Sequence, residues 1–199
     1  MAKRPTLMLD LPQWLRDRQR TTLELRSPWW PYGAADAVAK RLPAGASVFE
    51  FGGGGSTLWL HDKGAKVTTV EHHRGWHDDL RRLLPDEVTL ILREPTTEGS
   101  ISSEGEPGGF FDDYVATVSA LPDESLDLVI VDGRARVACG LAAMGKVKRG
   151  GMLLLDDSDR PRYAPLRERL EAWAREDFRG LGPGGGRVQQ TSVWEAPIA

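Results

Sequence analysis

The chain has 199 residues, a formal net charge of −3 and one cysteine, and 40% of its residues are hydrophobic. This length suits one domain with a full core, and no apolar run reaches the roughly 18 residues that span a bilayer, so we expect a soluble protein with no membrane contact. A lone cysteine forms no internal disulfide, and residues 1–15 lack the uninterrupted apolar stretch of a secretory signal. We therefore expect a cytoplasmic protein.

Basic residues are only mildly concentrated in the chain. Residues 1–45 hold eight basic and four acidic residues, a net charge of +4, against −7 for the remainder. A surface that binds nucleic acid normally shows a denser Lys/Arg stripe with aromatic side chains between the charges. We therefore expect a small-molecule partner and no nucleic acid.

Residues 1–32 are expected to form an N-terminal segment ahead of a main domain at 33–199. The segment ends in SPWWPY at 27–32, which is stiff and apolar because prolines interrupt the aromatic residues. Three roles stay open for it: a wall of a substrate pocket, a cover for the edge of the core, or a contact with a second subunit in a homodimer.

The remaining chain alternates strand and helix patterns, which predicts an α/β fold with a parallel sheet covered on both faces. Strands are predicted at 48–51, 66–70, 88–92, 126–131 and 152–155. Helices are predicted at 36–42, 56–62, 76–84, 110–121, 135–147 and from Pro165 through Trp173. An antiparallel strand pair, near Phe178 and at 188–194, closes the chain. The expectation is a single doubly wound, mostly parallel, seven-stranded sheet with a terminal antiparallel strand pair.

Residues 93–109 interrupt this alternation. They are rich in Gly, Ser, Glu and Pro and contain one strong hydrophobe, Ile101. Because such a stretch cannot form a core, we expect either a flexible loop or a lid that substrate orders.

Acidic residues finish four of the predicted strands, at Glu50, Glu71, Asp132 and the pair Asp156-Asp157. The carboxyl ends of parallel strands meet at one edge of a sheet, where ligands of open α/β folds bind. The first of these strands also runs into four glycines, 52–55, and then into a predicted helix. A side-chain-free turn at a helix start lets a nucleotide lie against the peptide groups, so the sequence predicts a nucleotide site.

The pattern Glu50-x-Gly52-x-Gly54-x-Ser56, with Glu71 nineteen residues after Gly52, resembles class I S-adenosylmethionine (SAM) dependent methyltransferases. The resemblance covers roughly residues 34–194. It implies that Glu71 binds the ribose hydroxyls and that Glu50 holds the cofactor's ammonium group, directly or through water. The residues expected to contact SAM are Glu50, Gly52, Gly53, Gly54, Ser56, Thr57, Glu71, His72 and Asp132. Asp132 and Asp156 are the expected catalytic residues, and the expected reaction is methylation of a small molecule, most readily at a hydroxyl oxygen.

The acids after the fourth and fifth strands are also similar to those of metal-dependent O-methyltransferases. That resemblance suggests Mg²⁺ bound by Asp132, Asp156 and Asp157, since carboxylate oxygens suit this ion. Arg134 stands where the sugar O-methyltransferases have a further acid. Arg134 and Arg136 therefore offer two alternatives: they bind an anionic substrate, or they pair with the acids and neutralise them.

Two other functions stay open. An NAD(P)-dependent oxidoreductase also has a glycine turn followed by an acid some 20 residues later. Its third glycine would fall at Thr57 or Leu58, and no Tyr-x-x-x-Lys pair is evident. A non-catalytic SAM-binding protein would keep the nucleotide site, although it would not need the acids after the fourth and fifth strands.

Overall fold

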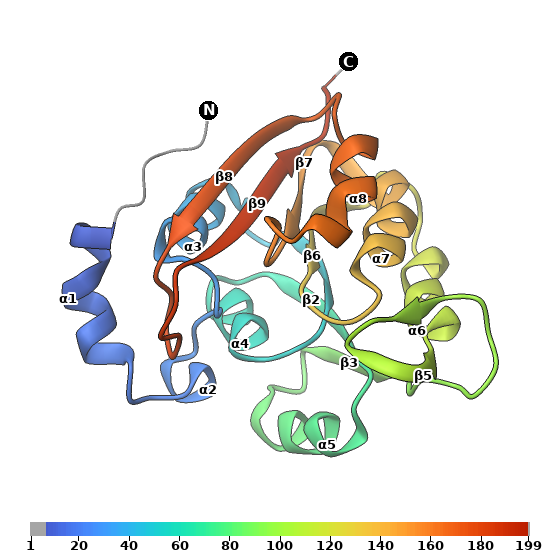
Figure 1. The fold of residues 1–199 in the computed structure, drawn as a ribbon, viewed down its shortest axis with the longest axis horizontal. Helices are drawn as coiled ribbons and strands as arrows, with labels where there is room; N and C mark the ends of the chain where they lie inside the picture. The colour runs from blue at the N-terminus through green and yellow to red at the C-terminus, as the bar shows by residue number, and fades with distance from the viewer. Residues whose placement is uncertain (1–6, 199) are drawn as a thin grey trace.

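A seven-stranded sheet forms the middle layer of the computed structural model, which describes residues 7–198 (Figure 1). The strands are β1 (Ser47–Phe51), β2 (Lys66–Glu71), β3 (Thr89–Leu92), β6 (Leu126–Val131), β7 (Val147–Leu155), β8 (Ala174–Gly180) and β9 (Gln189–Glu195). Their order is β3-β2-β1-β6-β7-β9-β8, with β9 antiparallel to both of its neighbours and the other pairings parallel. The predicted sheet and its terminal antiparallel pair are confirmed.

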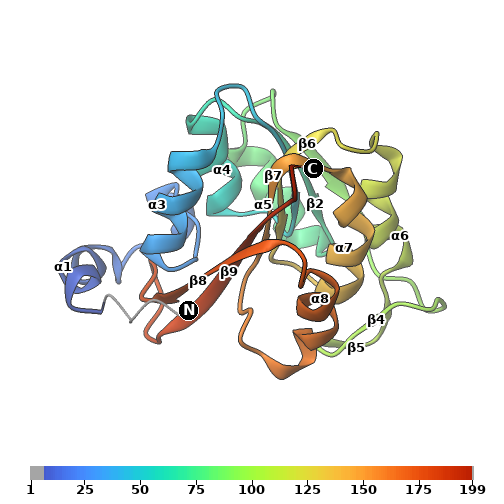
Figure 2. The same ribbon diagram turned by 90° about the horizontal axis from the view of Figure 1, so that it is seen from above.

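Helices cover both faces of the sheet (Figure 2). One layer contains α3 (Tyr32–Arg41), α4 (Gly55–Asp62) and α5 (Arg74–Leu83), and the other contains α6 (Asp112–Ala116), α7 (Arg136–Ala143) and α8 (Ala164–Arg169). Alternate residues of a strand point to opposite faces. Accordingly, Val129 and Val131 of β6 belong to the core under α6, α7 and α8, whereas Leu128 and Ile130 belong to the core under α3, α4 and α5. Both cores are fully apolar at β6, which explains its continuous hydrophobic sequence.

Several helices are shorter than their apolar spacing predicts. The predicted helix at 110–121 is α6 followed by a 3₁₀ turn at Thr117–Ala120, and that at 135–147 is α7 followed by a 3₁₀ turn at Met144–Lys146. The helix after Pro165 ends before Trp173. Tighter 3₁₀ turns at helix ends keep side chains near the core without continuing the α-helix, so an apolar pattern overestimates helix length.

The stretch at 93–109 is an ordered hairpin rather than a flexible loop. It contains β4 (Ser102–Ser103) and β5 (Glu106–Phe110), paired antiparallel. Asp112 accepts backbone N–H groups of Ser100 and Ile101 at 3.0 and 3.1 Å, and Ile101 packs against the core. Side-chain to backbone hydrogen bonds therefore order this segment, and such bonds leave no mark on a hydropathy pattern.

The N-terminal segment packs on the glycine turn of the sheet. It contains α1 (Leu7–Asp17) and α2 (Thr22–Leu25), and residues 1–6 of the predicted segment lie outside the described residues. A Cβ atom at Gly55 would collide with the backbone carbonyls of Thr22 and Ser27, so only glycine allows this contact. Among the helices formed by residues 7–198, none combines the length and apolar character that crossing a bilayer requires.

Candidate functional site

A cavity of about 460 Å³ opens at the carboxyl edge of the sheet. Its walls come from the glycine turn and Ser56, from 71–73 after β2, from Trp76 of α5, from 132–134 after β6, and from Thr22 and Trp29 of the N-terminal segment. The volume lies in the range of small-molecule sites. The structure thus brings most of the predicted site residues to one cavity, and we call it the cofactor cavity.

The glycine turn presents bare backbone to this cavity. Gly52 has φ of +91°, and a Cβ atom there would lie 2.9 Å from the Cα of Gly133, so the turn and the loop after β6 touch. At Gly54 the backbone is extended, and a Cβ atom would meet nothing within 4 Å. The space above Gly54 is therefore room for a ligand rather than for the protein's own side chains.

Glu50 lies behind the turn and does not line the cavity. It is fully buried, and its two carboxylate oxygens accept hydrogen bonds from the hydroxyls of Ser56 and Thr57 at 2.5 Å each. Burial raises the pKa of Glu50 to about 7, although both hydroxyls oppose the shift. Glu50, Ser56 and Thr57 thus fix the first turn of α4, and Glu50 is not part of the cavity lining.

Glu71 lies at the cavity wall with one carboxylate oxygen already held. Its Oε1 accepts the backbone N–H groups of His72 and His73 at 2.8 and 2.9 Å, and lies 2.7 Å from Nδ1 of His72. Burial opposes ionisation, but these contacts outweigh it and lower the pKa of Glu71, so the group is a carboxylate at neutral pH. All three contacts use Oε1, which leaves Oε2 for hydroxyl donors of a ligand.

Trp76 is a cavity residue that the sequence analysis missed. The residue is 37% exposed, and its indole N–H donates to the backbone carbonyl of Gly53 at 2.9 Å. The helix begins two residues earlier than predicted, with His73 as N-cap accepting the backbone N–H of Trp76 at 3.1 Å. The sequence feature that could have placed Trp76 at the site is its short distance along the chain from Glu71.

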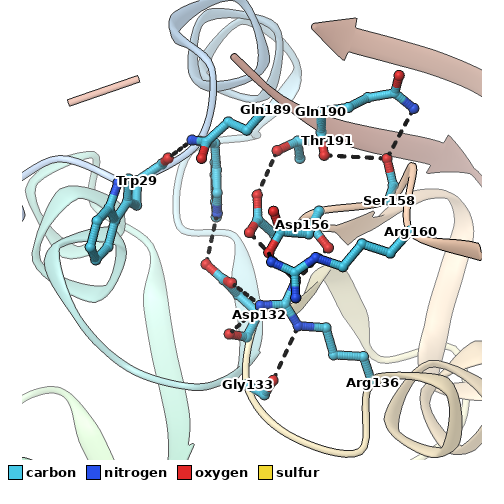
Figure 3. Close-up of polar contacts among 12 residues, drawn as sticks. Trp29, Asp132, Gly133, Arg136, Asp156, Ser158, Arg160, Gln189, Gln190 and Thr191 are labelled. Carbon is cyan, nitrogen blue, oxygen red and sulfur yellow. Dashed lines mark hydrogen bonds and ion pairs between the residues drawn. The ribbon is translucent and has the colours of Figure 1, made fainter. Parts of the chain in front are cut away.

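Beside the cavity, Arg136 lies between the carboxylates that follow β6 and β7 (Figure 3). Its guanidinium is 2.9 Å from Oδ1 of Asp132, 3.4 Å from Oδ2 of Asp156 and 3.7 Å from Oδ2 of Asp157. It also donates to the backbone carbonyls of Asp132 and Gly133, at 3.2 and 3.1 Å. Of the two roles expected for the arginines, Arg136 therefore has the second: it pairs with the acids and neutralises them.

The prediction of a metal ion at Asp132, Asp156 and Asp157 does not fit this geometry. The arginine occupies the space between the carboxylates where a cation would bind, and Asp157 pairs in addition with Arg160 and Arg187. Within residues 7–198, no group of three or more histidine, cysteine or acidic side chains is placed to hold a metal ion. A bound cation there would face the positive charge of Arg136, which is the physical reason for the correction.

Asp132 and Asp156 form a pair of mostly buried acids on either side of Arg136. Burial raises the pKa of Asp132, and the charge of Asp156 raises it further, while Arg136 works against both effects. Burial likewise raises the pKa of Asp156, again opposed by Arg136. Thr191 donates its hydroxyl to Asp156 at 2.8 Å. One arginine for two acids leaves the pair able to hold a proton, which is the property of a general base.

The N-terminal segment contributes to the same region through two adjacent tryptophans. Trp30 is fully buried and donates its indole N–H to Oδ2 of Asp132 at 3.2 Å. Trp29 is 57% exposed, lines the cofactor cavity, and has its carbonyl held by the side-chain amide of Gln189 (Figure 3). The segment therefore positions one acid and also supplies part of the cavity wall.

Solved structures that share this fold include several methyltransferases. The TehB-like SAM-dependent methyltransferase from Corynebacterium glutamicum matches with a TM-score of 0.55 at 14% identity, over 95% of this chain and 97% of that one. The 1,6-didemethyltoxoflavin N1-methyltransferase from Burkholderia thailandensis was solved with 1,6-didemethyltoxoflavin and S-adenosylhomocysteine. It matches with a TM-score of 0.54 at 14% identity, over 95% of this chain and 83% of that one. The precorrin-6y C5,15-methyltransferase from Geobacter metallireducens matches with a TM-score of 0.51 at 16% identity, over 81% of this chain and 87% of that one. A scan against protein-family models and a search of curated proteins found no match.

Proposed function

We propose that this chain is a SAM-dependent methyltransferase that transfers a methyl group to a small-molecule acceptor, at a hydroxyl oxygen. The observation that carries the proposal is the shared cavity of the glycine turn and Glu71, in a sheet whose order is β3-β2-β1-β6-β7-β9-β8. A dinucleotide-binding oxidoreductase has no strand inserted antiparallel between its last two strands. The sheet order therefore favours the methyltransferase over the NAD(P) alternative.

The residues that line the cofactor cavity fit SAM. Oε2 of Glu71 is placed to accept hydrogen bonds from ribose hydroxyls, and the bare turn at Gly54 leaves room for the remaining nucleoside. Trp76 offers an exposed indole ring to an adenine base. When bound, SAM supplies an electrophilic methyl group on a sulfonium that departs as a neutral thioether.

The contribution of the chain to the reaction is positioning and proton removal. Asp132 lines the cavity, and its raised pKa makes it a stronger base than an ordinary aspartate. Arg136 and Trp30 fix its two carboxylate oxygens, so the base is already oriented when an acceptor binds. A hydroxyl beside Asp132 would lose its proton as the new carbon–oxygen bond forms.

The neighbours support a small-molecule acceptor but differ in the atom methylated. By their names, one acts at nitrogen N1 of 1,6-didemethyltoxoflavin and another at positions C5 and C15 of precorrin-6y. The hydroxyl acceptor in our proposal rests on Asp132 instead, because a nucleophile that must lose a proton needs a base nearby. A non-catalytic SAM-binding protein would have no use for this arrangement.

The test is incubation of the purified protein with SAM and a panel of phenols, sugars and amines, followed by mass spectrometry. A gain of about 14 Da in one acceptor, together with formation of S-adenosylhomocysteine, is the expected result. A parallel assay with NAD(P)H monitors nicotinamide absorbance. Oxidation or reduction of nicotinamide without methyl transfer would establish the oxidoreductase instead, and SAM binding without turnover across the panel would favour the non-catalytic protein.

A further inference from the structure

A second cavity, of about 440 Å³, adjoins the cofactor cavity at the same edge of the sheet. One wall is the β4–β5 hairpin region, 100–105, and the opposite wall is the first turn of α7 with the loop that precedes α8. Gly133 and Arg134 line both cavities. A molecule in the second cavity therefore lies directly beside a molecule in the first.

The lining of the second cavity combines an apolar floor with positive charge. Ile101, Val137 and Leu141 provide apolar surface, and Leu141 is 42% exposed despite its size. Four arginines line the cavity, whereas Glu104 is the only acidic residue of the lining; the arginines are Arg134, Arg136, Arg160 and Arg162. Such a lining suits a ligand with an apolar body and an anionic group.

Arg134 has a hydrogen-bond donor that a ligand could use. Its Nε atom is buried, and within residues 7–198 it has no hydrogen-bond partner. The nearest carboxylate, that of Glu106 on the hairpin, lies 3.6 Å from this nitrogen, which is too long for a hydrogen bond. A guanidinium with an unpaired buried donor at the junction of two cavities is suited to bind an anion held between them.

Arg162 lines the same cavity, where it packs on the ring of Tyr163 and forms an exposed ion pair. Its Nη1 lies 2.6 Å from Oε2 of Glu104. This ion pair joins the loop before α8 to the turn of the hairpin. The two side chains are 35% and 68% exposed, and exposed ion pairs of this kind contribute little to stability. A ligand anion can replace Glu104 at small cost. Arg136 and Arg160 are less available, because the aspartates after β6 and β7 hold them.

We propose that the second cavity binds the methyl acceptor, and that the acceptor carries a carboxylate or phosphate group bound by Arg134 and Arg162. This inference rests on the proposed function, since it places the acceptor beside the bound cofactor. The apolar body of the acceptor packs on Ile101, Val137 and Leu141. The acceptor class is thus a small amphipathic acid rather than a neutral sugar or an amine.

The test compares three probes of similar size by calorimetric titration into protein saturated with S-adenosylhomocysteine. The probes are 4-hydroxybenzoate, phenyl phosphate and the neutral 4-hydroxybenzamide. We expect at least one anion to bind about tenfold more tightly than the amide, and the tighter anion identifies the head group. Arg162→Gln should remove most of this preference, while the exposed Arg82→Gln on α5, the matched control, should keep it.

Titration of S-adenosylhomocysteine alone separates the two proposals. If it binds and the anions show no preference over the amide, the anionic acceptor is wrong and the methyltransferase stands. If Arg162→Gln keeps the full preference, the proposed anion site at Arg162 is wrong and the methyltransferase stands. If S-adenosylhomocysteine fails to bind the wild type, the proposed function fails. Anion preference that depends on Arg162 in that case would still establish the charge of the ligand.

Discussion

The indole N–H of Trp30 donates to Oδ2 of Asp132 at 3.2 Å, across 102 residues of sequence. The contact joins the N-terminal segment to the acid that we assign as general base. Trp30 has no exposed surface, and Arg136 holds the other oxygen of Asp132, which lines the cofactor cavity. The N-terminal segment is therefore part of the proposed catalytic arrangement.

Trp30→Phe should lower the rate of methyl transfer about tenfold and leave the affinity for S-adenosylhomocysteine within about twofold. The ring volume is largely retained, but one oxygen of Asp132 loses its donor and the base is less well oriented. Turnover and calorimetric affinity, measured on the same preparation, check this. Trp173→Phe is the matched control, because Trp173 is a partly buried tryptophan on the opposite face of the sheet. Equal losses of affinity and turnover would contradict the assigned role.

Alanine at two positions of the glycine turn should affect different properties: ligand binding at Gly54 and stability at Gly52. Gly54→Ala should fold normally, because a Cβ atom there meets no protein atom within 4 Å, and should weaken SAM binding because the methyl group occupies the cavity. Gly52→Ala should lower the free energy of unfolding by roughly 2 to 4 kcal/mol, since φ is +91° and the Cβ atom would press on Gly133. Chemical denaturation and ligand titration of both variants measure this. Undiminished SAM binding by Gly54→Ala would place the ligand elsewhere.

Glu50→Gln should change how stability depends on pH. The pKa of Glu50 is about 7 in the folded chain against 4.5 when unfolded, so the folded state binds its proton more tightly. The free energy of unfolding therefore falls as pH rises from about 4.5 to 7, by up to about 3 kcal/mol from this group. Glutamine does not ionise and removes this loss. The free energy of unfolding of the variant should therefore rise relative to that of the wild type as pH increases across this interval. Urea denaturation at several pH values measures it. A constant difference would mean that Glu50 is ionised throughout.

Tyr114 and Gly133 form a second tight contact beneath the cavities. The hydroxyl of Tyr114 is buried, and within the described chain it has no hydrogen-bond partner. Tyr114→Phe should therefore raise the free energy of unfolding by about 1 kcal/mol. Gly133→Ala should destabilise the protein because its Cβ atom would collide with this hydroxyl, and Tyr114→Phe should rescue part of the loss. Thermal denaturation of the four proteins measures the coupling, and strict additivity would show that the contact carries no strain.

Much of the fold follows from the sequence because the buried parallel strands have an unmistakable composition. Leu126–Val131 has one polar residue, Asp127, and is otherwise apolar, which is typical of a central strand, and the glycines after Phe51 predict the turn between β1 and α4. The acids at strand ends follow from the same argument, because parallel strands bring their carboxyl ends to one edge. These features are local, so hydropathy and spacing suffice to find them.

The site could not be completed from the sequence because its decisive contacts join distant residues. Arg136 points back to the acids after two strands, and this orientation follows from the turn at Ala135, whose φ is +48°. A carboxylate triad suitable for a metal and one neutralised by arginine have the same sequence pattern. Trp76 was missed as a site residue because the contact of its indole N–H with the carbonyl of Gly53 joins positions 23 residues apart. Only the folded chain distinguishes these cases.

The central claim is that the glycine turn and Glu71 together hold the nucleoside of SAM. Its most direct test is the calorimetric affinity of S-adenosylhomocysteine for the wild type and for Glu71→Ala, with the exposed Glu87→Ala as control. We predict saturable binding to the wild type and to Glu87→Ala, and a loss of about 1.5 to 3 kcal/mol for Glu71→Ala because the ribose hydroxyls lose a charged acceptor. Wild-type protein that binds no S-adenosylhomocysteine, or Glu71→Ala that binds it as tightly as the wild type, would contradict the account.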